Sequence, residues 1–214
     1  MRMTLKPFGF AAALALAGLV ACTSGTDSAP PPAPVPAAMT LAYTNPASSG
    51  WRLVKDASST PTRVVLNLVG PSGTRTRGVG FNLKAPAGAR FGTFTGGLPI
   101  QDAGVYQLHA FGSTDPNEPV ALAGGLKAGN LLSVGIYQKD RDQPAQDSGV
   151  ALCRIAVTLD TAAGIPAGTA LPLSVLKAKV IPEDIGAFTD DLWTLDRKMR
   201  MADITIATGT LTAQ

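Results

Sequence analysis

Hydrophobic side chains alternate with small or polar ones in a series of short runs from residue 51 onward. In the run 62–70, for example, Val64, Leu66 and Leu68 fall on one face of an extended chain. Such alternation is typical of a strand with one buried face, and Gly, Pro, Asn and Asp separate the runs as turn residues do. The pattern predicts nine or ten strands, at 51–55, 62–70, 79–85, 89–95, 104–111, 130–140, 149–160, 169–181 and 202–213.

No long amphipathic helix separates these runs, whereas parallel strands would need crossover helices between them. We therefore predict an all-β fold of antiparallel strands, packed as a sandwich or closed as a barrel. Asp190–Met201 is the one stretch with helical spacing, since Leu192, Leu195 and Met199 share a side. It fits a helix or a structured loop, and the sequence leaves both open.

The run 169–181 changes phase part-way along its length. Leu171, Leu173 and Val175 share one phase, and the apolar residues from Leu176 onward take the other. An extra residue in one strand of a pair causes such a switch, so we predict a β-bulge or a strand that crosses between sheets. Pro172 fits an edge or a bulge because proline has no N–H to donate.

The N-terminus has the three-part layout of a secretory signal peptide. Arg2 and Lys6 precede an apolar stretch at 8–20, and small residues follow it. A membrane span needs about 20 apolar residues, and this stretch is shorter. The pattern predicts a signal peptide over 1–21.

The sequence LVAC at 19–22 resembles the bacterial lipoprotein signal, in which a branched apolar residue and two small or medium residues precede a cysteine. The resemblance implies cleavage between Ala21 and Cys22 and a lipid (diacylglycerol, then usually a further acyl chain such as palmitate) on Cys22. It places the protein in the bacterial cell envelope, and Thr23, in place of an aspartate, favours the outer membrane. The alternative is an ordinary signal peptide with a coincidental cysteine.

Residues 22–38 lack apolar periodicity and include five prolines between Pro30 and Pro36. Such a segment favours polyproline II and spans about 50 Å if fully extended. We interpret it as a tether between the lipidated cysteine and a β-sandwich domain at 39–214. A proline-rich docking ligand is the alternative.

The net charge argues against nucleic acid as a partner. The formal charge is +3, but loss of Arg2 and Lys6 with the signal leaves 16 basic against 15 acidic residues. A nucleic-acid-binding domain would need a cationic face, which this balance does not predict. Cys153, left without a partner once Cys22 is lipidated, shares the phase of Ile155 and Val157, so we expect a buried free thiol.

Four stretches in chain order resemble the cohesin and cellulose-binding-module type of nine-stranded jelly-roll sandwich. They are VVLNLVGPSGTRTRGVGFNLKAPAGARF, LLSVGIYQ, GVALCRIAVTLDTAAGIPAGTALPLSV and ITIATGTLTA. The resemblance covers most of 39–213 and implies a jelly-roll β-sandwich of about nine strands. It further implies a non-catalytic module that binds protein, as cohesins do, or carbohydrate.

The candidate ligand contacts are aromatic residues, because carbohydrate modules of this type stack rows of them on sugar rings. Trp51, Tyr137 and Trp193 stand beside polar or out-of-phase residues, although no evenly spaced row is visible. The single histidine, His109, is predicted to be structural.

Acidic residues offer one candidate metal site. Asp140, Asp142 and Asp147 lie in the loop after a predicted strand, where oxygen ligands could hold a structural calcium ion. Arg141 intervenes, so a solvated loop is the simpler interpretation, and we predict no other cofactor.

These observations predict a lipid-anchored, non-catalytic binding or adhesion module for an envelope protein or carbohydrate. The alternatives are a structural envelope lipoprotein without a ligand, and a hydrolase that uses Asp or Glu.

Overall fold

The computed structural model describes residues 33–103, 120–138, 144–183 and 201–214. The chain divides into two compact units, Met1–Pro34 and Val35–Gln214, and the second contains every strand described below. Across the described ranges, none of the helices has the length and apolar character needed to cross a bilayer. The proposed helix at 190–201 lies outside the described residues, except for Met201, which is not helical.

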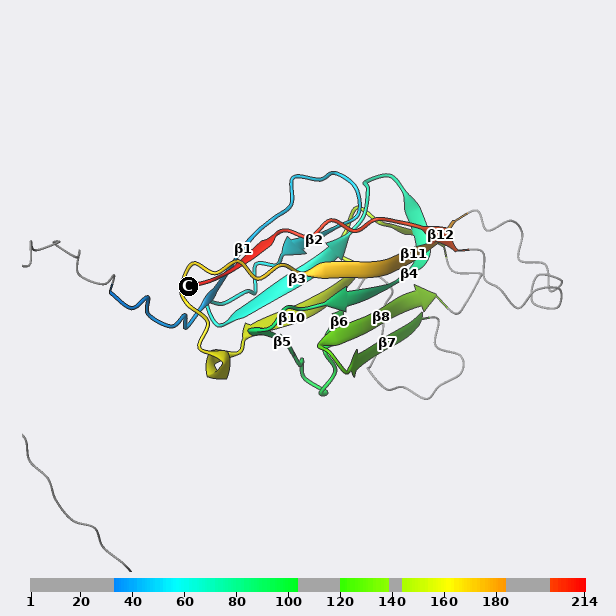
Figure 1. The fold of residues 1–214 in the computed structure, drawn as a ribbon. Coiled ribbons are helices and arrows are strands. Elements are labelled where there is room, and N and C mark those ends of the chain that lie inside the picture. Colours follow the sequence, from blue (N-terminus) through cyan, green and yellow to red (C-terminus); the bar gives the residue numbers. More distant parts are fainter. Residues whose placement is uncertain (1–32, 104–119, 139–143, 184–200) are drawn as a thin grey trace, which may run out of the picture. The chain divides into compact units, whose positions relative to one another are not determined.

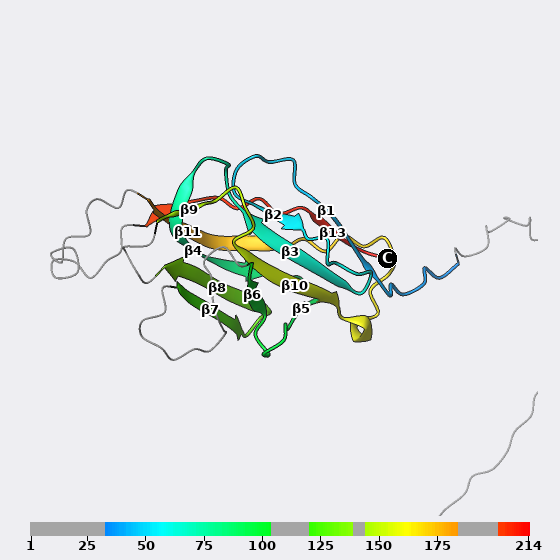
Figure 2. The same cartoon turned by 180° about the vertical axis from the view of Figure 1, so that it is seen from behind.

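The second unit is an all-β structure whose paired strands are antiparallel, as predicted (Figure 1). One sheet has the order β2 (Arg52–Lys55), β3 (Arg63–Val69), β10 (Cys153–Leu159) and β5 (Ala89–Gly92), and β6 (Ile100–Asp102) also pairs with β10. Figure 2 shows β3 and β10 side by side.

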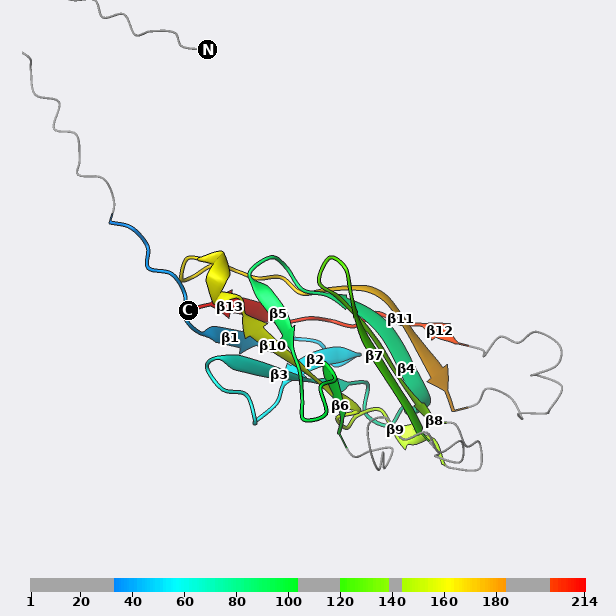
Figure 3. The same ribbon diagram turned by 90° about the horizontal axis from the view of Figure 1, so that it is seen from below.

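The other large sheet has the order β12 (Ala202–Asp203), β11 (Ser174–Pro182), β4 (Arg75–Lys84), β8 (Leu131–Gln138) and β7 (Val120–Lys127), with β9 (Gln146–Asp147) on β4. A separate pair joins β1 (Leu41–Thr44) to β13 (Thr210–Ala213), and a short 3₁₀ turn spans Thr161–Ala163. Figure 3 separates the strands of the two large sheets as two layers.

The core lies between these layers because each sheet turns its apolar phase inward. The inward residues of the five-stranded sheet are buried: Leu53, Val64, Leu66, Leu68, Phe91, Ile100, Cys153, Ile155 and Val157. Those of the six-stranded sheet belong to the same cluster: Val79, Phe81, Leu83, Leu132, Val134, Ile136, Ala178 and Val180. Two sheets that pack face to face around one apolar core form a sandwich.

The predicted free thiol is confirmed. Cys153 is fully buried within this cluster, and no disulfide holds it. Burial away from water disfavours the thiolate and raises the pKa of Cys153 to about 12, with Asp102 adding a smaller repulsion. The side chain therefore acts as a small apolar group.

Of the two predicted explanations for the phase change in 169–181, the structure shows the β-bulge, and it falls at Leu176. The register between β11 and β4 shifts between Val175 and Lys177, which leaves Leu176 as the extra residue. Its side chain is 56% exposed, while Ala178 beyond the bulge is buried. The bulge thus returns the apolar phase of β11 to the core.

Some predicted boundaries were wrong. The strand predicted at 79–85 begins earlier, because β4 already starts at Arg75. The final run, predicted as one strand, forms two short strands, β12 and β13, in different sheets. Strands β1, β6 and β7 were not predicted, because runs of three or four residues, or of Ala and Gly, show no clear alternation.

The chain enters this unit beside its C-terminus. Ala38 is buried, and its N–H donates to Ile165 O at 2.7 Å, while Ala37 forms a bridge with Pro166. Met39 N donates to Gln214 O at 2.7 Å. Residues 36–38 therefore already contact the sandwich, and both ends of the domain lie at one end of the β1–β13 pair.

Tyr43 joins three separate stretches of chain. Its hydroxyl donates to Leu53 O at 3.0 Å and accepts from Gly209 N at 2.6 Å. Burial raises the pKa of Tyr43, so the hydroxyl stays protonated and able to donate. Gly209 permits this approach, because a Cβ there would collide with Thr44 O.

Asn130 links the two sheets at the β7–β8 turn. It is the single non-glycine residue with positive φ in the described chain, at 58°. Its Nδ2 donates to three carbonyls beyond β4, those of Ala89 at 2.7 Å, Ala85 at 3.3 Å and Pro86 at 3.4 Å. Asparagine tolerates this backbone conformation better than most residues.

We predict that Asn130→Gly lowers the free energy of unfolding by about 1–2 kcal/mol, because the backbone conformation survives and the side-chain hydrogen bonds are lost. Asn130→Ala should cost about 1 kcal/mol more, since alanine also strains the left-handed turn. Urea unfolding of the three proteins measures both steps. Equal stability of the alanine and glycine variants would contradict the backbone part of this account.

Candidate functional site

The predicted ligand-contact residues fall in different places. Trp51 is only 8% exposed and belongs to the core cluster, close to Gly70. A side chain so covered has no free ring face for a sugar to stack on, so we do not keep it in the candidate site. Tyr137 lies on β8 and is partly exposed, on the outer face of the six-stranded sheet. Trp193 lies outside the described residues, as do His109, Ala21 and Cys22.

The described aromatic residues form no stacking platform. Tyr43, Phe81 and Phe91 are buried like Trp51. The other partly exposed ring besides Tyr137 is Phe94, which belongs to the connection after β5 and lies 4.7 Å from the guanidinium of Arg63. Within the described ranges, the two partly exposed rings therefore lie in unconnected parts of the fold.

The predicted calcium site is described only at Asp147. Its Oδ1 accepts from Gly149 N at 2.7 Å and from Gly73 N at 3.3 Å, so it stabilises the turn around β9. Asp140 and Asp142 lie outside the described residues, and the described part of the chain has no cluster of three metal-ligating side chains. Calcium binding stays a prediction.

The outer face of the six-stranded sheet has a floor almost bare of side chains. In the register of β4 with β8, Gly80 lies opposite Gly135 and Asn82 lies opposite Ser133. Gly125 on β7 continues this floor opposite Ser133. A Cβ added at Gly135 or at Gly125 would meet no heavy atom of the described residues within 4 Å, so no described side chain covers the backbone at these two positions.

Lysine side chains lie on two sides of this bare floor, along β11 and at one end of β4 and β7. Lys84, Lys127, Lys177 and Lys179 all occupy the outward phase of their strands and are exposed. Lys179 Nζ pairs with Asp203 at 2.7 Å, whereas the other three form no ion pair with any described residue. The face therefore combines accessible backbone with an excess of positive charge, and an acidic surface complements it.

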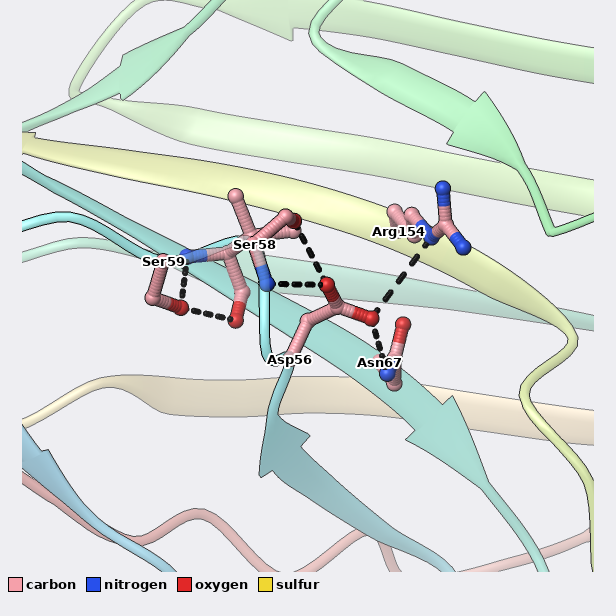
Figure 4. Close-up of polar contacts among 6 residues, drawn as sticks. Asp56, Ser58, Ser59, Asn67 and Arg154 are labelled. Carbon is pink, nitrogen blue, oxygen red and sulfur yellow. Dashed lines mark hydrogen bonds and ion pairs between the residues drawn. The ribbon is translucent and has the colours of Figure 1, made fainter.

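The outer face of the other sheet carries a polar network around Asp56 (Figure 4). Asp56 Oδ1 accepts from the hydroxyl of Ser58 at 2.5 Å and from its N–H at 2.8 Å. Asp56 Oδ2 accepts from Asn67 Nδ2 at 2.7 Å and lies 3.7 Å from Arg154 Nε. Arg154 and Asn67 are register partners on β10 and β3, so the sheet itself places them together.

This network holds a loop against a strand. The hydrogen bonds from Ser58 hold the pKa of Asp56 below its ordinary value, with smaller help from Asn67 and Arg154. Ser59 next to it accepts from Val65 N and donates to Val65 O, which fastens the loop to β3. A lowered pKa is the opposite of what a general acid at neutral pH requires, so the geometry assigns Asp56 a structural role.

Other described carboxylates are also paired with cations. Asp160 lies 2.6 Å from Arg90, and Glu183 lies 3.3 Å from Arg75. The pairs lie in separate parts of the fold, whereas a glycosidase needs two carboxylates about 5–10 Å apart across a cleft.

Sequence reasoning missed the lysine-rimmed floor and the Asp56 network. Both depend on which strands are neighbours, because the members come from β4, β7, β8 and β11 or from β2, β3 and β10. The sequence did indicate part of the lysine-rimmed face. In the run with Leu132, Val134 and Ile136 facing inward, alternation places Gly135 and Tyr137 on the outward side.

Comparison with known proteins gives matches at the level of structure. No family model matches the sequence, and no curated protein matches it. The sixth cohesin of Acetivibrio cellulolyticus scaffoldin B, solved with a dockerin, aligns with TM-score 0.48 and 9% identity over 75% of this chain and 96% of that one.

Two further matches are a non-cellulosomal cohesin of the archaeon Archaeoglobus fulgidus and a cohesin module of a Clostridium perfringens family 33 glycoside hydrolase. The first has TM-score 0.43 and 10% identity over 75% of this chain and 87% of that one. The second has TM-score 0.42 and 7% identity over 74% and 96%.

We predict that the free energy of unfolding falls as the pH drops below about 4, partly through Asp56. Its folded-state pKa lies below the unfolded value, so its contribution is complete above the unfolded pKa and is lost as the pH falls through the folded one. Asp56→Asn and Ser58→Ala should each flatten this part of the profile, measured by urea unfolding between pH 2 and 5. An unchanged slope in both variants would contradict the assigned role.

Proposed function

We propose that this protein is a lipid-anchored component of the bacterial cell envelope whose β-sandwich is a non-catalytic module that binds a protein partner. The outer face of the six-stranded sheet is the proposed binding face. The observation that carries this proposal is the bare floor of Gly80, Gly135 and Gly125, whose backbone no described side chain covers and which has lysines on two of its sides.

The proposed location rests on the first 38 residues. LVAC at 19–22 supports lipidation of Cys22, and the proline-rich segment after it supports a spacer. Two or more acyl chains hold a protein on a membrane stably, whereas one does so only marginally. A sandwich at the end of such a tether works within about 50 Å of the membrane.

We predict that Cys22→Ser leaves a precursor that keeps its signal segment and takes up no labelled fatty acid. The serine lacks the sulfur that carries the thioether. Metabolic labelling with palmitate, followed by mass measurement of the membrane fraction, tests this directly. Cys153→Ser is the matched control, because its thiol is buried and should leave labelling unchanged. Normal processing of the Cys22→Ser protein would refute the anchor.

Protein is the better-supported class of partner for the sandwich. Stacking on a polysaccharide uses several exposed aromatic rings, and on this face the described residues supply Tyr137 alone. A flat floor with exposed backbone and surrounding cations instead fits the surface of an acidic protein, where charge complementarity speeds association and selects the partner. The exposed lysines Lys84, Lys127 and Lys177, which pair with no described acid, make that association sensitive to salt.

We predict that Gly135→Trp abolishes capture of the envelope partner, or weakens it at least about tenfold. The indole would stand on the floor in open space, so the variant should fold with unchanged stability. Thr158→Trp is the control, because Thr158 lies in the outward phase of β10 on the other sheet. Quantitative pull-down from solubilised envelopes, followed by titration with the purified partner, measures the effect.

Two results would overturn the proposed function. One is a stoichiometric partner that binds Gly135→Trp and wild type equally. The other is glycan-array binding that Tyr137→Ala removes, which would identify the sandwich as a carbohydrate-binding module.

A further inference from the structure

The two long sides of the sandwich are built differently. On one side, the segment 204–207 lies between the sheets and bonds to both. Ile204 N donates to Ala178 O at 3.1 Å on β11, and Ala207 N donates to Trp51 O at 2.8 Å beside β2. Leu53 N donates back to Ala207 O at 2.9 Å. In Figure 1 this red segment runs along the upper side of the domain, next to β2 and β11.

The opposite side is bounded by β5 and β7, which both lie along the lower side in Figure 1. Each is the last strand of its sheet among the described residues. Between them lies an open groove of about 500 Å³. Its apolar lining comes from Phe91, Leu126 and small residues, and its polar lining is Arg90, Lys127, Asn130 and Asp160.

On this side, the core leaves an inward-facing apolar residue, Leu126, uncovered. It lies opposite Leu132 in the register of β7 with β8, which is the inward phase of the sheet. Leu132 is fully buried, but Leu126 is 57% exposed. The five-stranded sheet therefore does not reach over the end of β7, and an apolar side chain aimed at the core stays in contact with water.

The edge of β7 also lacks the features that normally block strand addition. Edge strands are protected by shortness, charge, proline or a bulge. β12 has two residues, and β2 has four with a charge at each end. β7 pairs with β8 over eight consecutive residues without a register shift, contains no proline, and carries its single charge, Lys127, at its end.

Charge indicates what kind of strand would fit. Arg90 and Lys127 line the groove with a single acid, Asp160, which is already held by Arg90 at 2.6 Å. Lys127 forms no ion pair with any described residue, so the groove has an excess positive charge. A second copy of β7 would bring another lysine and no acid along the strand. The complementary occupant is an extended segment of a different chain that carries a carboxylate.

We infer that the groove between β5 and β7 is a binding site for an extended peptide segment, which adds as a strand to the edge of β7. Its inward side chains cover Leu126 and Phe91, and an acidic residue pairs with Lys127. Main-chain hydrogen bonds supply affinity in this mode of recognition, and alternate side chains supply specificity. The groove shares Lys127 with the lysine-rimmed face, but Leu126, Phe91 and the edge of β7 belong to the groove alone, so the inference does not depend on the function proposed for that face.

The probe is a displayed library of random peptides of about 10 residues, the upper length of ordinary strands. The full chain is the bait, and selected peptides are resynthesised and titrated by fluorescence anisotropy. We expect them to alternate apolar residues and to contain an aspartate or glutamate. Leu126→Glu and Lys127→Glu should each weaken their binding about tenfold or more.

The chain supplies a matched control on the far side of the same sheet. Leu176 and Lys177 repeat the Leu-Lys pair, and Leu176 is 56% exposed, as Leu126 is at 57%. Leu176→Glu and Lys177→Glu should leave peptide affinity unchanged. Since all four side chains are exposed, all four variants should fold, which circular dichroism and the unfolding midpoint verify.

Three results would overturn the inference. The first is that neither Leu126→Glu nor Lys127→Glu changes the affinity of the selected peptides. The second is that the Leu176 and Lys177 controls lower that affinity equally. The third is a wild-type dimer in solution that Leu126→Glu dissociates, which would make a second copy of the chain the occupant. A Gly135→Trp protein that still binds the peptides but loses its envelope partner would separate this site from the lysine-rimmed face.

Discussion

Apolar contact between the inward faces of the two large sheets is the constraint on which the rest of this domain depends. Each strand turns every second side chain to the shared core, so a slip of one residue would expose its whole apolar set. β11 illustrates the requirement that a strand keep its apolar phase toward the core. Its sequence changes phase, and the structure accommodates the change by expelling Leu176 in a bulge, which returns Ala178 and Val180 to the core.

The same constraint leaves the outward phases free to differ. On the five-stranded sheet, outward positions form the Asp56 network, which fastens a loop to β3. On the six-stranded sheet, outward positions are Gly, Ser, Asn and Lys, which leave the backbone open. One face is thus used for stability and the other remains available for a partner, on a domain that a tether at 22–38 is expected to hold near a membrane.

The two long sides of the sandwich are closed to different extents. Tyr43 and the segment 204–209 tie β1, β2, β11 and β13 together along one side. Across the described residues, the other side ends in two unpaired strand edges, with Asn130 joining the sheets at one end of the groove. Extended chains tend to add to an unpaired strand edge, especially beside an exposed apolar residue. The inferred peptide site therefore lies where the core is left uncovered.

The sequence alone determined the all-β class, the inward residues of the long strands, the phase change in β11 and the buried thiol of Cys153, because each depends on local periodicity. Only the tertiary structure decided that Trp51 is buried, that Gly135 and Lys177 share a face, and that Asn67 meets Arg154. Those relations depend on which strands become neighbours, and residues far apart in the chain meet through register. Alternation specifies which face of a strand is buried and does not specify the neighbouring strand.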